Sequence, residues 1–131
     1  MQKGCDSMVD PVKQLIIIRR DLKMRRGKEI AQGAHASLMF LMRILKDPDT
    51  AVSKAQAEWL WGSHTKVTLQ VADGLTLLAC YQRAHMNNIE AHLVTDKGIT
   101  EFGGVLTNTA VAIGPERSSV LDPLFGMLRL Y

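Results

Sequence analysis

The sequence has few of the residues that build a disulfide framework and no run long enough for a membrane span. Only two cysteines occur in 131 residues, Cys5 and Cys80, and neither has a CxxC partner, so a disulfide is possible but nothing requires one. The longest apolar runs, such as residues 15–18, are far too short to cross a bilayer, and no signal-peptide pattern opens the chain. These absences predict a soluble, cytoplasmic protein with no membrane partner.

Several common catalytic and cofactor motifs are missing as well. Without GxSxG, a serine hydrolase built on a nucleophile elbow is disfavoured. No HExxH, paired CxxC or cluster of aspartates indicates a metal, and neither GxGxxG nor GxxxxGK[ST] indicates a nucleotide. Aromatic residues make up only 5% and are not interleaved with basic ones as in RNA-binding strands. The sequence therefore predicts no metal and no cofactor.

The charge is modest in total but unevenly distributed. The net charge is +3, and basic residues crowd positions 19–28 against a single acid, Asp21. Such a cluster concentrates positive potential where a polyanion could dock, although a solvated basic loop has the same composition. The basic residues are Arg19, Arg20, Lys23, Arg25, Arg26 and Lys28.

Hydrophobic periodicity predicts one α/β domain. Strands are expected over residues 13–19, 66–71, 89–95 and 109–113, and helices over 27–46, 51–61 and 74–85. The alternation implies a small mixed, mostly parallel four-stranded sheet with helices on both faces, an α/β/α sandwich, whose last strand follows without a helix and can run antiparallel. Residues 1–12 are predicted to be a disordered tail and residues 13–131 a single domain. Ligands in such sheets gather at the carboxyl ends of the strands, here residues 21–27 and 95–98.

The long helix carries the first candidate site residues. Lys28, Gln32 and His35 lie four and three residues apart, beside the stripe that periodicity predicts to be buried. With the amides of the first turn, Lys28 could form an anion or oxyanion site. Alternatively, Gln32 and His35 are border residues satisfied by a neighbouring loop. The predicted buried stripe is Ile30, Ala31, Ala34, Leu38, Leu41, Met42 and Leu45.

Asp96 is the second candidate, because it follows an apolar strand and precedes Gly98. A carboxylate there can be an ordinary Asx-turn residue, or it can hold a lysine or a water in a site. Thr100 and Thr109 follow near the same sheet edge. Position alone leaves both interpretations of Asp96 open.

Taken together, these segments resemble the type 2 peptidyl-tRNA hydrolases. The resemblance covers residues 13–131 and is most specific over the first segment. It rests on Arg20-Asp21-Leu22-Lys23-Met24, Gly27-Lys28, Ala31-Gln32, His35-Ala36, Lys66-Val67, Asp96, Gly98, Thr100, Thr109, Ala112-Ile113-Gly114-Pro115, Asp122, Gly126 and Leu128-Arg129-Leu130-Tyr131.

The resemblance implies a metal-independent carboxylic ester hydrolase with an α/β/α fold, often dimeric, that cleaves peptide from tRNA. The family's functional residues map onto Lys28, His35, Asp96, Thr100 and Thr109, with Gln32 as a helper. We hypothesise that Asp96 positions or activates water, or holds Lys28. Lys28 would then stabilise an oxyanion or a phosphate, and the threonines would orient water and substrate. His35 is a proton shuttle or a wall residue. Phosphates of the acceptor stem would meet Arg19, Arg20, Lys23, Arg25 and Arg26, with the ester-linked peptide at the site.

Two departures from the family pattern lie beside Asp96. Ile99 and Glu101 replace the arginine and glutamine of many members, and the stretch to Thr109 is one residue longer. These features keep two other functions open. One is a non-catalytic tRNA- or protein-binding module of the same fold, and the other is an esterase for other acylated tRNAs.

Overall fold

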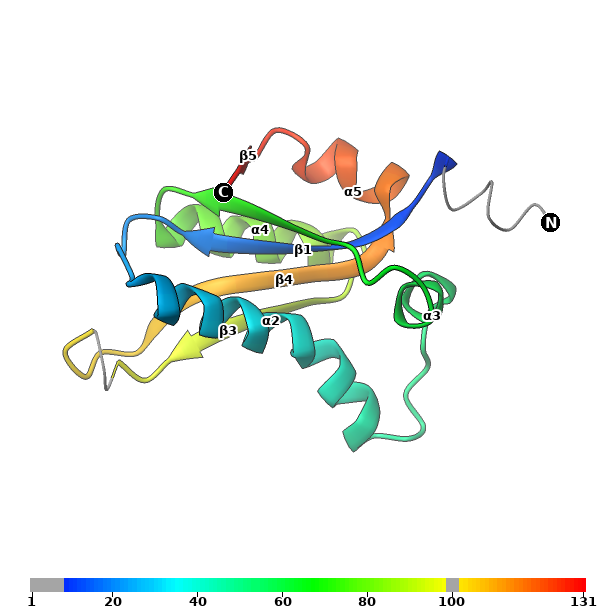
Figure 1. The fold of residues 1–131 in the computed structure, drawn as a ribbon, viewed down its shortest axis with the longest axis horizontal. Coiled ribbons are helices and arrows are strands. Elements are labelled where there is room, and N and C mark those ends of the chain that lie inside the picture. Colours follow the sequence, from blue (N-terminus) through cyan, green and yellow to red (C-terminus); the bar gives the residue numbers. More distant parts are fainter. Residues whose placement is uncertain (1–8, 99–101) are drawn as a thin grey trace.

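The computed structural model describes residues 9–98 and 102–131 and shows three layers (Figure 1). A five-stranded sheet has α2 and α3 on one face and α4 and α5 on the other. The elements are β1 (Val12–Arg19), α2 (Arg26–Lys46), α3 (Lys54–Leu60), β2 (Lys66–Val71), α4 (Gly74–Met86), β3 (Ala91–Asp96), β4 (Thr107–Arg117), α5 (Ser118–Phe125) and β5 (Arg129–Leu130).

The α/β class with helices on both faces is confirmed, but the predicted mostly parallel four-stranded sheet is wrong in its pairing. The strand order is β3-β4-β1-β2-β5, and only β1 and β2 pair in parallel. Strand β4 pairs antiparallel with both β3 and β1, which confirms that it runs antiparallel. Strands β3 and β4 follow one another in the chain and pair antiparallel, as in a hairpin, and this pairing inserts β4 between β1 and β3. Strand β5 adds an antiparallel edge beside β2.

Both faces of the central strands are buried, which explains their unbroken apolar runs. Leu15 and Ile17 of β1 pack towards α4 and α5, while Ile16 and Ile18 pack towards α2. The second core contains Ala36 of α2. The sheet therefore fixes α2 along β1 and β4, with its first turn near the carboxyl ends of β1 and β3, where the predicted site residues lie (Figure 1).

The prediction of which side of α2 is buried is wrong. Ile30, Leu38 and Leu45 of the predicted stripe are each more than half exposed. The buried residues of the helix are Gln32, Ala36, Ser37 and Phe40. Polar side chains are tolerated there because they are paired inside the interface. The Gln14 amide of β1 donates to the Ser37 carbonyl over 3.0 Å, and the Ser37 hydroxyl donates to the Gln14 oxygen over 2.5 Å. Apolar periodicity cannot detect a face buried through small and mutually bonded polar residues.

The termini of the domain differ in detail from the expected ones. Strand β1 begins one residue before the predicted boundary at 13, and the Asp10 carboxylate accepts hydrogen bonds from the backbone and hydroxyl of Ser119. Residues 1–8 of the predicted tail lie outside the described residues. Helix α5 and strand β5 follow the last of the predicted elements, in a region where the sequence pattern predicted neither a helix nor a strand. Within residues 9–98 and 102–131, no helix has the length and hydropathy needed to span a bilayer.

Candidate active site at the carboxyl end of the sheet

Asp96, the last residue of β3, is the centre of the site. Its side chain shares the α2 face of the strand with Val94, two residues earlier. The Oδ2 atom accepts from Lys28 Nζ over 2.7 Å and from Gln32 Nε2 over 3.2 Å. The Oδ1 atom accepts from the Gly98 backbone N–H over 2.6 Å. Three of the predicted site residues, from segments more than 60 residues apart, therefore meet at one carboxylate.

This carboxylate is held ionised. The ammonium of Lys28 and the Gly98 N–H hold the pKa of Asp96 below its ordinary value, although burial acts in the opposite direction. The side chains of Lys28 and Asp96 are 17% and 13% exposed, so the ion pair is sheltered but not sealed. A carboxylate with a lowered pKa is a weak base. The geometry therefore favours Asp96 as the residue that holds Lys28 over Asp96 as a strong proton acceptor.

Thr109 reaches the site because of an irregularity in β4. Val94 pairs with Ala110 and Thr95 with Asn108, so Thr109 is an extra residue between two paired positions. Such a bulge redirects side chains and often lies beside active sites. The Thr109 hydroxyl, fully buried, donates to Gln32 Oε1 over 2.5 Å. Thr109 and Gln32 thus extend the network behind Asp96.

The loop after β3 contributes two residues that the sequence reasoning did not assign. Gly98 has a φ of +76°, and a Cβ on it would lie 2.4 Å from the carbonyl oxygen of Val105, so only glycine fits this position. The loop closes on itself through the Gly104 N–H, which donates to the Gly98 carbonyl over 2.8 Å. The Phe102 ring centroid lies 5.8 Å from Lys28 Nζ, within the range of a cation–π contact. Only the Asp-x-Gly spacing marked Gly98 in the sequence, and nothing marked Phe102.

One predicted site residue is not brought into this network. His35 is exposed on α2, one turn beyond Gln32, and no contact in the described structure joins it to Asp96. Thr100, together with Ile99 and Glu101, lies outside the described residues.

The predicted tRNA-binding residues fall into two groups. The Arg19 guanidinium bonds the Asp21 carboxylate in two places and the Asn108 carbonyl, which ties β1 to β4. The Arg20 guanidinium lies 4.7 Å from the ring centroid of Tyr131. These two side chains are therefore engaged with their own chain. Exposed side chains of the second group follow in the loop and at the start of α2, namely Lys23, Arg25 and Arg26.

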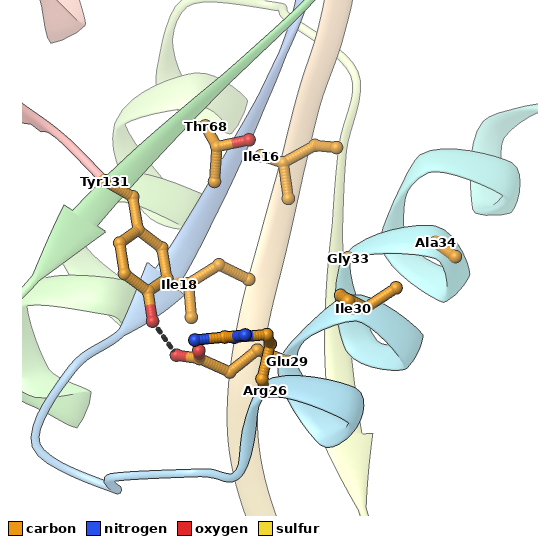
Figure 2. Close-up of a pocket in the computed structure, with 9 residues that line it drawn as sticks. All are labelled: Ile16, Ile18, Arg26, Glu29, Ile30, Gly33, Ala34, Thr68 and Tyr131. Carbon is orange, nitrogen blue, oxygen red and sulfur yellow. Dashed lines mark hydrogen bonds between the residues drawn. The ribbon is translucent and has the colours of Figure 1, made fainter.

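A pocket of about 280 Å³ lies on the flank of α2 next to β2 (Figure 2). Arg26, Glu29 and Ile30 of α2 face Ile18 across it, and Tyr131 closes one side. The Tyr131 hydroxyl donates to the Glu29 carboxylate (Figure 2). The turn of helix that carries Lys28 is thereby attached to the edge of the sheet.

Within the described residues, no group of three or more His, Cys, Asp or Glu side chains converges as metal ligands do. What the site offers instead is an ammonium held beside a carboxylate, with an amide and a hydroxyl aligned behind them. Such a set can stabilise developing negative charge and orient a water molecule.

Several known proteins are similar to this chain. A solved structure of a protein of unknown function from Agrobacterium tumefaciens matches 92% of this chain and 97% of its own, with a TM-score of 0.55 and 12% identity, which indicates a shared fold. Among curated relatives, the peptidyl-tRNA hydrolase of Methanopyrus kandleri is 40% identical over 90% of this chain and 97% of its own length. The one from Methanocaldococcus jannaschii is 36% identical, over 91% and 99%. Peptidyl-tRNA hydrolase 2 of Saccharomyces cerevisiae is 32% identical over 92% of this chain and 58% of the yeast protein.

The family model described as peptidyl-tRNA hydrolase PTH2 matches residues 12–131, which is all of the chain from the first residue of β1 onwards. The match includes Lys28, Asp96 and Thr109, the residues that the fold gathers at one edge of the sheet. The chain therefore belongs to the peptidyl-tRNA hydrolase PTH2 family.

Proposed function

We propose that this protein hydrolyses the ester between peptide and tRNA in peptidyl-tRNA, so that the tRNA is recycled. The observation that carries the proposal is the ion pair of 2.7 Å between Lys28 and Asp96, backed by Gln32 and Thr109, in a chain of this family. Ester hydrolysis needs a positioned water, a stabilised oxyanion and an acceptor for the proton of the water. The cytoplasm, where translation supplies the substrate, is the proposed location.

Lys28 supplies the positive charge in this mechanism. Its ammonium is fixed by Asp96 at the first turn of α2, close to the carboxyl ends of β1 and β3. When water adds to the ester carbonyl, negative charge develops on the carbonyl oxygen. A fixed ammonium within hydrogen-bond reach stabilises that charge, and loss of one such donor costs ~3–4 kcal/mol of transition-state stabilisation.

Asp96 orients Lys28 and has the capacity to orient water too. An ionised carboxylate offers about four lone-pair directions, and three are used by Lys28, Gln32 and Gly98. The remaining direction can accept a hydrogen bond from the attacking water. That water would be held against the carbonyl. As its oxygen adds, one of its protons passes to the departing ribose oxygen, directly or through solvent, and the proton of the carboxylic acid product is released to solvent.

Gln32 and Thr109 are positioning residues. The Thr109 hydroxyl donates to Gln32 Oε1, which leaves Gln32 Nε2 turned towards Asp96. This order of donors fixes the amide of Gln32 in one orientation and keeps Asp96 an acceptor on both oxygens. We assign Thr100 a similar role in orienting substrate from its place in the family signature, and we assign His35 to the wall of the site.

The tRNA would approach from the side of the basic loop. The exposed side chains of Lys23, Arg25 and Arg26 precede and open the helix that carries Lys28, so phosphates of the acceptor stem bound there would lie near the ester. Arg19 shapes this face through its bonds to Asp21, and Arg20 does so through its contact with Tyr131. Recognition would be of backbone and shape more than of base sequence.

The test compares two substrates on the purified protein, an N-acetylated aminoacyl-tRNA and the same aminoacyl-tRNA unblocked, each labelled in the amino acid. We expect release of label only from the blocked form, and loss of release in Lys28→Met. Cleavage of both forms would indicate an esterase for acylated tRNAs in general. Binding without any cleavage would leave a non-catalytic module and refute the proposal.

We also propose that a second copy of the chain covers the exposed apolar stripe of α2. Ile30, Leu38 and Leu45 project from one side of that helix, and the pocket beside Ile30 adds a recess of about 280 Å³. Contiguous apolar patches of this kind commonly mark interfaces. Sedimentation should give a dimer for the parent and a monomer for Leu38→Glu, whereas Met86→Glu, at an exposed position on α4, should remain dimeric. A monomeric parent would refute this interface.

A further inference from the structure

The largest groove among the described pockets lies beside the candidate active site. Its volume is about 780 Å³, within the range of about 300–1,000 Å³ that ligand sites usually have. It runs between the loop after β3 and the start of α4, at the carboxyl ends of β1 and β2. Apolar side chains dominate its lining, namely Leu22, Leu75, Phe102, Val105 and Leu106.

The apolar side chains of this groove are unusually exposed. Leu75 is 82% exposed in the first turn of α4, and Leu106 is 70% exposed opposite it. Val105 is also exposed. Several exposed apolar side chains around one recess mark a binding surface, because burying each of them under a ligand is favourable.

The charged groups at the groove are neutralised within the protein. Arg19 is bonded to the Asp21 carboxylate, and Asp73 accepts from the backbone and hydroxyl of Thr76 as the N-cap of α4. A phosphate chain would find no uncompensated cation among the described residues that line this groove. The exposed cation Arg26 lies instead at the start of α2, where it lines the pocket beside Ile30, and Lys23 is exposed in the preceding loop.

Phe102 connects the groove to the candidate active site. Phe102 lines it and also places its ring centroid 5.8 Å from Lys28 Nζ. Asn108, which lines it too, immediately precedes Thr109. A substrate whose ester lies at Lys28 can therefore extend from the site along two surfaces, one basic and one apolar.

On this basis we infer that the groove binds the peptide portion of the substrate and favours apolar side chains near the ester. The inference rests on the proposed function, because it divides one substrate between two surfaces. The polyanionic tRNA takes the basic side, and the acyl chain takes the groove between Leu75 and Leu106. These two leucines are specificity-determining residues, and they contact the peptide without taking part in the chemistry.

The experiment measures kcat/KM for three substrates that share one tRNA and one esterified residue. The first carries only an N-acetyl group, the second an N-acetylated peptide with leucines before the esterified residue, and the third the same peptide with lysines. The parent should prefer the leucine peptide to the acetyl substrate, and Leu75→Glu should reduce that preference about tenfold. Leu75→Glu should also raise the relative rate on the lysine peptide, because it supplies a charge partner.

The matched control is Met86→Glu, which makes the same change at a residue that is also 82% exposed but at the far end of α4. Its preference should equal that of the parent, and circular dichroism should show all variants folded. If Leu75→Glu slows all three substrates by the same factor, the groove holds the tRNA end and the inference is wrong. If the parent shows no preference, the inference also fails, although the proposed hydrolysis stands. Only a parent inactive on every substrate would refute the hydrolysis itself.

Discussion

Replacement of Asp96 by asparagine tests the centre of the mechanism. The carboxylate accepts from Lys28 and Gln32 at Oδ2 and from the Gly98 N–H at Oδ1, so donors face both oxygens. An amide has only one oxygen. In either orientation its NH₂ group must therefore face a donor, which breaks either the bond from Gly98 or both bonds from Lys28 and Gln32. The substitution is conservative in size but not in hydrogen bonding.

The expected loss of activity can be derived from this geometry. Without a carboxylate, the ammonium of Lys28 is no longer held at the ester and the water loses its acceptor. We expect kcat to fall by about 10²-fold or more, which corresponds to ~2.7 kcal/mol of transition-state free energy. The free energy of unfolding should fall by only ~1–3 kcal/mol, the cost of one donor left unmatched. Affinity for tRNA should hold or rise slightly, since a negative charge near the phosphates is removed.

The assay is single-turnover hydrolysis of N-acetylated aminoacyl-tRNA, with thermal unfolding measured on the same preparation. Asp122→Asn is the control, because Asp122 also forms an ion pair of 2.7 Å, with Lys13, but lies outside the site. That variant should keep the parent's kcat. The double variant Lys28→Met with Asp96→Asn should be no slower than the worse single variant, because the two residues act as one unit. Turnover of Asp96→Asn within about threefold of the parent would remove Asp96 from the mechanism.

Four further predictions follow from the same structure. Turnover should survive exhaustive chelation, since the sequence offers no set of metal ligands, and activity abolished by EDTA but restored by Zn²⁺ or Mg²⁺ would contradict this. Reversing the charge of Arg25 and Arg26 to glutamate should reduce the log–log salt slope of tRNA binding by ~0.7–0.9 for each phosphate that the variant no longer neutralises; an unchanged slope would place the tRNA elsewhere. Burial opposes ionisation of Glu90, but hydrogen bonds from its neighbours lower its pKa from 4.5 to about 2, so its stabilisation is complete above about pH 4.5 and is lost as the pH falls towards 2. In urea denaturation, the free energy of unfolding of the parent should therefore fall by ~3 kcal/mol more than that of Glu90→Gln as the pH is lowered through this range. Equal losses in the two proteins would refute the lowered pKa of Glu90. Gly98→Ala should slow turnover at least about tenfold, because its Cβ would meet a carbonyl oxygen at 2.4 Å, whereas Gly27→Ala meets no atom within 4 Å and should stay active.

Much of the site could be predicted because its residues lie at ends of elements that the sequence marks clearly. The aliphatic run of β1 and the strand before Asp96 are visible as apolar segments. Both strands run antiparallel to β4, so their carboxyl ends lie at the same edge of the sheet. The pairing of Lys28 with Asp96 then follows from the register of the helix on the sheet. The sequence marked Thr109 only by its place near the same sheet edge, and the family resemblance implied its functional role.

The features of the fold and the site that were not predicted depend on tertiary contacts, which leave no periodic pattern in the sequence. Insertion of β4 between β1 and β3 is a matter of topology, and the same strands would be predicted with or without it. The buried side of α2 is set by bonds between Gln14 and Ser37, which a hydrophobicity pattern counts as polar and therefore exposed. Phe102 reaches Lys28 only because its loop folds back at Gly98. In each case a specific contact overrides the average preference of the residue type.

The bulge in β4 makes the composition of the site depend on the length of the strand as well as on the identity of its residues. A deletion of Asn108 would restore regular alternation, pair Thr109 with Thr95 and turn the Thr109 side chain towards α4 and α5. Insertions before β4 behave differently, since extra residues between 102 and 106 fall in a loop and leave the pairing intact. Length changes among relatives should therefore be common before Thr107 and rare between Thr107 and Val111. An alignment that places a gap inside that short interval would assign the role of Thr109 to the wrong residue.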